Sequence, residues 1–277
     1  MTDRSRRRRR RRVPAKLVAS GAIVAAVLLI AALAPWIAPH DPTMLNTRAI
    51  LRGPSPEYLL GTDEFGRDLF SRVILGARPS LTIALGATAL AAALGTALGL
   101  VAGFFRGSIE QLFMRSLDVL LSFPPILLAM MIVGFAGSGI GNLIVVIGVL
   151  YVPTFGRLAY GATLQVAKLE YVEATLALGA RAPAVLLRHV LPNILSPLIV
   201  QVSLTTAAAI LLESGLSFLG LGVKPPTPSW GLMIDTARQY MLLSPTYLIA
   251  AASPLVVVVL SINVLGDALR DYLDPKL

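Results

Sequence analysis

Ionisable side chains inside otherwise apolar stretches are the residues of this chain that could do chemistry. Glu213 lies within the apolar stretch 194–221, and Asp118 lies just before the apolar stretch 119–156. A carboxyl group at membrane depth is costly in lipid, so it faces the protein interior or a water-filled path. Such a group could act as the acid or base of an intramembrane enzyme, line a solute pathway, or bind a neighbouring helix.

The polar residues in or beside the apolar stretches have different candidate roles. For Glu213, pathway lining and a hydrogen bond or ion pair between two helices both stay open. For Asp118, a satisfied carboxylate at a helix end near Arg115 is favoured over a place in a proton relay. Asn263 and Gln201 are uncharged candidates for the pathway or for interhelical hydrogen bonds, and the interhelical role is favoured for Asn263.

The composition argues against most cofactor chemistry. The chain has no Cys and only two His residues, so thiolate zinc sites, iron–sulfur clusters and a His-based metal cage are not expected. It has no Gly-Lys dipeptide, so the G-x-x-x-x-G-K-[ST] phosphate loop that binds ATP is absent. The segment GLSFLG at 215–220 resembles a nucleophile elbow, but its second Gly is one place late and no triad accompanies it. We therefore expect no cofactor and no metal, with an intramembrane enzyme using Glu213 or Asp118 as the remote alternative.

One polar stretch, EYVEATLALGARAPAVLLRHVLPN at 170–193, separates long apolar stretches. Residues 167–178 are rich in Ala, Leu and Glu, which favour a helix. Gly179 fits the position just after a helix end, where a positive φ is needed. Pro183 fits the first turn of a second short helix, and we expect Pro192 to end that helix. The small side chains around Gly179 leave a face that could lie in a partner's groove.

This stretch resembles a known loop. Glu173-Ala174-Thr175, three further residues, Gly179 and then Leu191-Pro192 resemble the EAA loop of the membrane subunits of bacterial ATP-binding-cassette importers. Thr175 and His189 stand where that loop usually has Ala and Ile. Four further blocks resemble the dipeptide/oligopeptide/nickel branch of these importers: LGTDEFGRDLFSR at 60–72, GARPSL at 76–81, SFLGLGVKPPTPSWG at 217–231 and LGDALRDYLDP at 265–275. Several blocks in family order are more specific than one, and the first block is similar to the C-type permease subunit.

The resemblance implies the binding-protein-dependent importer permease fold, with no catalytic residue. It also implies a B-type permease subunit, two cytoplasmic ATPase subunits and an extracytoplasmic solute-binding protein as partners. The implied activity is inward movement of short peptides by alternating access, and nickel, opines and haem are alternative solutes carried by importers of this branch. The residues implied to couple this chain to the ATPases are Glu170, Glu173, Ala174, Gly179, Ala180 and Arg181.

Composition by itself indicates a polytopic membrane protein. Hydrophobic residues make up 56% of the chain and charged residues 14%, against about 25% charged in ordinary soluble domains. At about 20 residues per crossing, the apolar stretches predict an all-α protein with six membrane spans: 17–39, 79–105, two within 119–156 folded at 136–142, 194–221 and 241–266. The chain then divides into an Arg-rich tail at 1–16, a first membrane helix at 17–39, an extracytoplasmic segment at 40–78, and a five-helix core at 79–277 with its coupling loop at 165–193.

Several details of these segments can be predicted. Residues 64–75 could form a short amphipathic helix at the surface, and 106–115 reads as a short basic loop. Phe123-Pro124-Pro125 should kink the third span, because a proline lacks a backbone donor and clashes with the preceding turn. A stripe of small residues recurs every four positions in the second span and predicts close helix packing, more plausibly within the subunit than on a partner: Ala87, Ala91, Gly95, Gly99 and Gly103.

The arginine run at 6–12 orients the chain. It directly precedes the first apolar stretch, so anionic lipid is the favoured contact and nucleic acid is not expected. A basic start, an apolar core and Ala32-Leu33-Ala34 also imitate a signal peptide, but the apolar stretch is long for one. Six spans place both ends on one side, and 17 of the 24 Lys and Arg residues then fall on that side. The positive-inside rule therefore predicts a multi-pass protein of the bacterial plasma (inner) membrane with both termini in the cytoplasm.

Overall fold

The computed structural model describes residues 14–273, so the predicted role of the arginine run at 6–12 falls outside the described residues. Across 14–273 the chain is helical and contains no β-strand, which confirms the all-α prediction. The helices are α1 (Ala15–Ile37), α2 (Leu69–Phe105), α3 (Gly107–Leu121), α4 (Pro125–Ala136), α5 (Ile140–Val166), α6 (Glu170–Ala177), α7 (Ala182–Val185), α8 (Leu191–Phe218), α9 (Trp230–Gln239) and α10 (Pro245–Leu273). A 3₁₀ turn covers Thr47–Ala49, and a π-helical segment covers Leu186–Val190.

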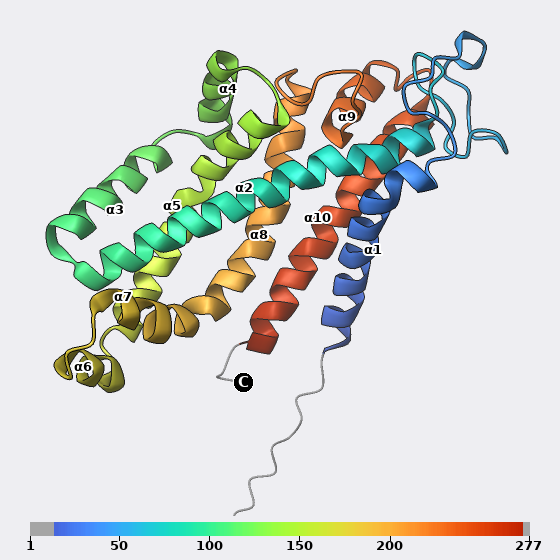
Figure 1. Cartoon of the computed structure of the whole chain (residues 1–277). Helices are drawn as coiled ribbons and strands as arrows, with labels where there is room; N and C mark the ends of the chain where they lie inside the picture. Colours follow the sequence, from blue (N-terminus) through green and yellow to red (C-terminus); the bar gives the residue numbers. More distant parts are fainter. Residues whose placement is uncertain (1–13, 274–277) are drawn as a thin grey trace, which may run out of the picture.

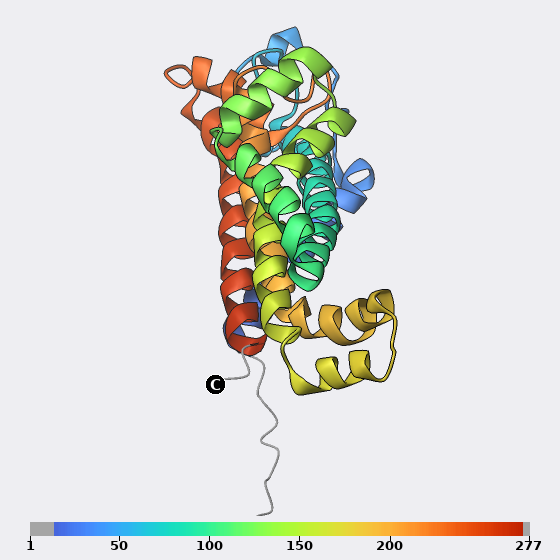
Figure 2. The ribbon, with the colours of Figure 1, turned by 90° about the vertical axis from the view of Figure 1, so that its left-hand side faces the viewer.

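The long helices form one bundle with two distinct ends (Figures 1 and 2). In both views the N-terminal end of α1 and the C-terminal end of α10 lie at the end of the bundle that carries α6 and α7. The opposite end carries α9 and the loop that joins α1 to α2. We term these the α6 end and the α9 end. Because the described chain starts and finishes at the same end, it passes along the bundle an even number of times.

Within residues 14–273, five helices are long and apolar enough to cross a membrane, and a bent pair, α3 with α4, can make a sixth crossing. The bend between α3 and α4 is 89°, at Ser122 to Pro124. This corrects the prediction of two full spans within 119–156. Pro124 and Pro125 break the helix where only a kink was expected, because neither proline has an N–H to continue the hydrogen-bond ladder. With only 12 residues, α4 is too short to cross alone, and the expected basic loop at 106–115 is part of α3.

The second long helix also begins earlier than expected. Asp68 accepts hydrogen bonds from Ser71 N and Ser71 Oγ at 2.9 and 2.6 Å, which caps α2 at Leu69. Ile74 and Ala77 are buried, so this first part of α2 packs against the protein and does not form a separate surface helix over 64–75. The helix α2 therefore begins ten residues before the predicted second span at Pro79.

The predicted stripe of small residues on α2 packs against α5 of the same subunit. A Cβ atom added at Gly95 would lie 2.5 Å from the Val152 carbonyl oxygen, and one added at Gly99 would lie 2.4 Å from the Gly156 carbonyl oxygen. Neither distance is compatible with a side chain. The two backbones therefore approach as closely as glycine allows, which gives van der Waals contact that lipid cannot replace.

The core lies where four helices meet. Ile83 of α2, Ile147 of α5 and Ile210 of α8 are each fully buried, and Val258 of α10 packs in the same cluster. The helix α3 joins this arrangement through Leu117, whose Cδ1 atom would lie 2.6 Å from a Cβ added at Gly156. Gly156 thus contacts α2 on one side and α3 on the other. The position of both helices therefore depends on their packing against α5.

We predict that Gly99→Ala destabilises the subunit, because its methyl group would press on the α5 backbone. Overpacking of this kind costs about 1–3 kcal/mol. Gly134→Ala in α4 is the matched control, since a Cβ there meets no atom within 4 Å and Ala gains helix propensity over Gly. In detergent, the Tm of the Gly99→Ala chain should fall by several degrees while that of Gly134→Ala holds or rises. Equal Tm values for the two variants would contradict the packing described here.

Candidate functional site

The helix α6 is eight residues long and ends as the sequence predicts. Gly179 has a φ of +86°, in the left-handed region that favours glycine. Its N–H donates to the Leu176 carbonyl oxygen at 2.9 Å, and the N–H of Ala180 donates to the Thr175 carbonyl oxygen at 3.3 Å. This pair of bonds closes the helix and reverses the chain direction. The turn at Gly179 thereby returns the chain toward the bundle.

The chain after this turn differs from the prediction. Pro183 occupies the first turn of α7, as expected. Pro192 does not end the second helix, because α7 continues through the π-helical segment Leu186–Val190 into α8. The Leu191 N–H donates to the Leu186 carbonyl oxygen, five residues back, so the turn before Pro192 is wider than an α-turn. A wider turn moves the backbone carbonyl away from the proline ring, and the helix can pass the proline unbroken.

The helix α6 is fastened to the bundle by one apolar and one polar contact. Val172 is completely buried, in a cluster that includes Phe155 of α5 and Val190. Asn193 Nδ2 donates to Tyr171 Oη at 3.0 Å and to the His189 carbonyl oxygen at 2.6 Å. Because Asn193 belongs to the first turn of α8, these bonds join α6 directly to a long helix. A force on α6 would therefore reach α5 and α8.

The other side of α6 is uncovered. Glu170, Glu173, Ala174, Gly179 and Arg181 are exposed, and Ala180 is half-buried. The six predicted coupling residues thus lie between the start of α6 and the start of α7. Figure 2 shows that this segment projects from the bundle. Leu178, which the sequence analysis did not single out, is 90% exposed beside these residues. Leu178 therefore adds an apolar side chain to the exposed surface beside Gly179.

Glu213 is buried at the α9 end of α8. Its Oε1 atom accepts a hydrogen bond from Ser217 Oγ at 2.7 Å, one turn along the same helix. A Cβ added at Gly222 would lie 1.8 Å from Ser217 Oγ, and one added at Gly231 would lie 2.7 Å from Ser217 Cβ. The block SFLGLGVKPPTPSWG therefore folds its loop tightly over Ser217. In this arrangement Glu213 is bonded one turn along its own helix.

Three other sequence candidates have partners that were not predicted. Asn263 Nδ2 donates to the Val259 carbonyl oxygen at 2.9 Å, within α10, and its bond to another helix stays a prediction. Gln201 Nε2 donates to Thr205 Oγ1 at 3.0 Å, within α8. Gln201 also lines a cavity of about 360 Å³ between α5, α8 and α10. Asp118 pairs with Arg157 of α5 at 2.5 Å, not with the nearby Arg115, because Arg157 faces it across the contact between α3 and α5.

A buried polar cluster at the α9 end went unrecognised in the sequence. Asp63 Oδ2 accepts from Arg67 Nε at 2.6 Å and lies 3.2 Å from Arg72 Nε. Glu64 accepts from Arg67 Nη2 at 2.8 Å and from the hydroxyl of Tyr247 in α10 at 2.9 Å. Buried charges are tolerated when they are paired in this way. The block LGTDEFGRDLFSR therefore holds the start of α2 against α10, and its alternation of acidic residues with Arg is the signal that could have revealed the cluster.

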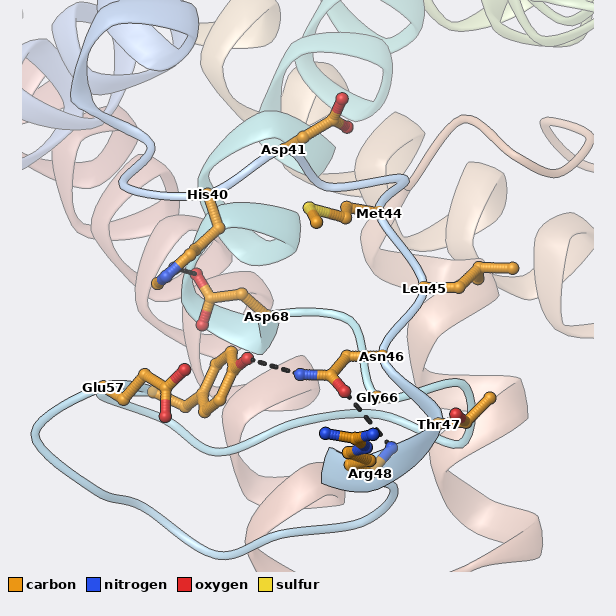
Figure 3. A pocket seen from close by; sticks show the side chains of 11 residues that line it. His40, Asp41, Met44, Leu45, Asn46, Thr47, Arg48, Glu57, Gly66 and Asp68 are labelled. Atoms are coloured by element: carbon orange, nitrogen blue, oxygen red, sulfur yellow. Dashed lines mark hydrogen bonds and ion pairs between the residues drawn. The ribbon is translucent and has the colours of Figure 1, made fainter.

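Next to this cluster a cavity of about 510 Å³ opens in the loop between α1 and α2 (Figure 3). His40 Nδ1 lies 3.5 Å from Asp68 Oδ2, and the His40 ring stacks on Tyr58 with centroids 5.3 Å apart. Asn46 Nδ2 donates to Tyr58 Oη at 3.1 Å. With Glu57 also on its wall, the cavity carries more acidic than basic side chains. It gives the α9 end a hollowed polar surface.

The whole chain has known relatives. Residues 95–277 match the family "Binding-protein-dependent transport system inner membrane component", and residues 7–54 match "N-terminal TM domain of oligopeptide transport permease C". The chain belongs to this family of importer permeases. It is a multi-pass inner-membrane subunit, and membership implies a partner permease, ATPase subunits and a binding protein in general.

Two similar proteins cover nearly all of the permease. The glutathione transport system permease protein GsiD of Pectobacterium atrosepticum is 40% identical over 94% of this chain and 87% of that protein. The dipeptide transport system permease protein DppC of Alkalihalophilus pseudofirmus is 40% identical over 92% of this chain and 84% of that protein. The inward-facing MetNI methionine ABC transporter contains a chain with the same fold, at a TM-score of 0.62 and 18% identity, over 74% of this permease and 98% of that chain.

These relationships confirm the C-type permease predicted from the sequence blocks and exclude the enzyme alternative. The permease is a transport subunit, and ATP hydrolysis is performed by its partners. The buried Glu213, held by Ser217 beneath a closely packed loop, is accordingly not a catalytic acid or base, and its role in the pathway or between helices stays a prediction.

We predict that Gly179→Val weakens transport without preventing assembly. A β-branched residue at a φ of +86° is strained by about 1–3 kcal/mol, which displaces a short exposed turn but does not unfold the bundle. Ala177→Val is the matched control, because it adds a similar isopropyl group to the same exposed face at a helical φ. In the reconstituted transporter, substrate uptake per ATP hydrolysed should fall strongly for Gly179→Val, less for Gly179→Ala, and least for Ala177→Val. If Gly179→Val keeps the wild-type ratio, the turn does not position α6.

Proposed function

We propose that this permease is the C-type subunit of an importer that moves short peptides inward by alternating access. The observation that carries the proposal is the construction of α6. It projects from the bundle with an uncovered face of small and acidic residues, yet Val172 and Asn193 fasten it to α5 and α8. An element that is both accessible and firmly attached can transmit a partner's movement.

The proposed coupling starts at the ATPases. Two cytoplasmic ATPase subunits would bind this permease and a B-type permease, each through a groove that receives the exposed turn at Gly179. When ATP draws the ATPases together, the pull on α6 would tilt α5 and α8 through the Phe155, Val172 and Val190 cluster. Because α5 also supports α2 and α3 by close contacts at Gly156, these helices would move with it. Such a movement opens the pathway to one side at a time.

The solute class follows from the relatives. The two similar permeases belong to dipeptide and glutathione systems, and glutathione is itself a tripeptide. Both matches extend over more than nine-tenths of this chain, so the similarity is not confined to one segment. Short peptides are therefore favoured over nickel, opines and haem, for which neither of these two relatives is named.

The orientation follows from the same proposal. The α6 end would face the cytoplasm with both termini, and the α9 end would face the extracytoplasmic binding protein. The acidic cavity at His40 and Asp68 lies at that outer end, beside the polar cluster of Asp63, and offers it a shaped surface. The apolar exposed residues of α1, such as Leu29 and Trp36, would contact membrane lipid.

We predict opposite accessibility for cysteines placed at the two ends of this cysteine-free chain. Leu178 is 90% exposed at the α6 end and Leu242 is 89% exposed at the α9 end. In sealed right-side-out vesicles, an impermeant thiol reagent should label Leu242→Cys and leave Leu178→Cys unlabelled until the vesicles are opened. Immediate labelling of Leu178→Cys would place α6 outside and remove it from the reach of any cytoplasmic ATPase.

We further predict dipeptide uptake by the complete transporter. Proteoliposomes containing both permeases and the ATPases, supplied with the binding protein and ATP, should accumulate a labelled dipeptide. Nickel and haem, tested in parallel, should stay at the level seen without ATP. Accumulation of nickel or haem in place of the dipeptide would show that the solute is assigned wrongly while leaving the importer assignment intact.

A further inference from the structure

An ion pair lies on an uncovered side of the bundle. Asp118 Oδ1 of α3 accepts from Arg157 Nη2 of α5 at 2.5 Å, and the two side chains are 58% and 55% exposed. Figure 2 shows α3 and α4 in front of the bundle. No described residue of the bundle buries the pair, so it meets either solvent, lipid or another subunit.

The length of α5 bears on the depth of the pair in a bilayer. The helix α5 has 27 residues and is therefore about 40 Å long, against about 30 Å for the hydrocarbon core of a bilayer. Arg157 stands nine residues before the last residue of α5, Val166, which is roughly 14 Å along the helix axis. If α5 is centred in the bilayer, Arg157 lies inside the hydrocarbon core, and the short side chain of Asp118 cannot reach the surface.

Other polar or small residues continue this feature along both helices. On α3 they recur at intervals of four, three and four, and on α5 at intervals of three, four and four, which places each set on one helix face. We name these eight residues the α3/α5 polar stripe: Gln111, Arg115, Asp118, Ser122, Thr154, Arg157, Gly161 and Gln165. All eight are exposed or half-buried.

Lipid is a poor neighbour for such a surface. A charged or amide side chain facing hydrocarbon is costly, and even a paired charge loses its hydration there. The lipid-facing side of α1 shows the contrast, because its exposed residues include Val18, Leu29 and Leu33 and no charge between Leu17 and Ile37. The α3/α5 polar stripe therefore belongs to water or to a polar partner surface.

We propose that the α3/α5 polar stripe lines the aqueous pathway, and that Asp118 and Arg157 form a binding subsite for a zwitterionic solute. The ammonium group of the solute binds Asp118, and its carboxylate binds Arg157, whose planar guanidinium accommodates a carboxylate by two parallel hydrogen bonds. In the empty state the two side chains neutralise each other. In the occupied state one internal ion pair is exchanged for two pairs with the solute, so no charge is left unpaired.

This inference rests on the proposed function, since it names the solute chemistry of the same importer. A short peptide with free termini carries one ammonium and one carboxylate group, which matches the two charges of the subsite. An N-acylated or C-amidated peptide lacks one of them. The subsite thus predicts that each terminal charge is recognised by one identified side chain.

Accessibility of the stripe tests its placement. Ser122→Cys and Gly161→Cys should react with an impermeant cationic thiol reagent in the assembled transporter, in either the nucleotide-free or the ATP-bound state, and a saturating dipeptide should slow the reaction. Leu29→Cys on α1 is the control for a lipid-facing position and should stay unreactive. If both stripe cysteines are as unreactive as Leu29→Cys in every state, the stripe is covered by the second permease or by lipid, and the proposal is wrong.

Charge-specific uptake tests the subsite itself. With one binding protein throughout, uptake of a dipeptide is compared with uptake of its C-amidated and N-acetylated forms, so the selection made by the binding protein cancels between variants. Arg157→Gln should reduce uptake of the free dipeptide roughly ten- to hundredfold, the range for a lost charged hydrogen bond, and should abolish the preference over the amide. Asp118→Asn should likewise reduce uptake of the free dipeptide. It should abolish the preference for the free dipeptide over the N-acetylated form and leave the preference over the C-amidated form.

The double variant Asp118→Arg with Arg157→Asp separates binding from packing. A pair that only holds α3 to α5 is restored by the exchange, so wild-type uptake and selectivity in the double variant would overturn the proposal. A subsite is not restored, because the charges are reversed relative to the arriving solute. If the wild-type complex takes up no dipeptide at all, the proposed function has failed. If it does, and the single variants slow every analogue equally, only the subsite has failed.

Discussion

The contact between α2 and α5 is the constraint on which the rest of this permease depends. Hydrophobic burial gives little drive for helix association in lipid, so stability comes from backbone proximity and van der Waals contact. Gly95 and Gly99 of α2 allow that proximity, and the facing carbonyl oxygens of Val152 and Gly156 leave no room for a side chain. The helix α5 also packs against α8, α4 and α3. A displacement of α5 would consequently be felt throughout the subunit.

The polar groups of the chain are concentrated where this scaffold leaves the membrane. At the α6 end the bond from Asn193 to Tyr171 ties a projecting helix to α8. At the α9 end the cluster around Asp63 secures the start of α2, and Ser217 secures the loop that follows α8. The two ends are thus rigid for different reasons, the first through a short helix and the second through buried charges. Asp118 and Arg157 stand apart from both, because they lie between the ends.

Much of this organisation could be predicted from the sequence. The apolar stretches predicted the all-α membrane class, and the spacing of Gly95 to Gly103 predicted the close packing within the subunit. Gly179 predicted the positive φ that ends α6. Each of these depends on local composition or on a short period, which a single sequence displays. The C-type permease family was likewise readable from blocks that keep their order along the chain.

The errors of prediction arose where tertiary contacts decide local structure. The helix α2 begins at Leu69 because Asp68 caps it and the protein packs against its first turns, so no separate short helix covers 64–75. The helix passes Pro192 because a π-helical segment precedes it. The Asp118 partner could not be found by proximity in sequence, since Arg157 is 39 residues away. The four-three-four spacing of polar residues on α3 was the available signal for that face.

The central claim is that α6 is the element through which partner ATPases move the bundle. The most direct test is site-specific cross-linking in the assembled, ATP-cycling transporter. A cysteine introduced as Ala177→Cys on the exposed face of α6 should be joined to an ATPase subunit by a short thiol-reactive cross-linker, with a yield that changes between the nucleotide-free and ATP-bound states. A cysteine at Leu242, at the opposite end, should give no such product. Absence of any ATPase cross-link from Ala177→Cys, in a complex that still transports, would contradict this account.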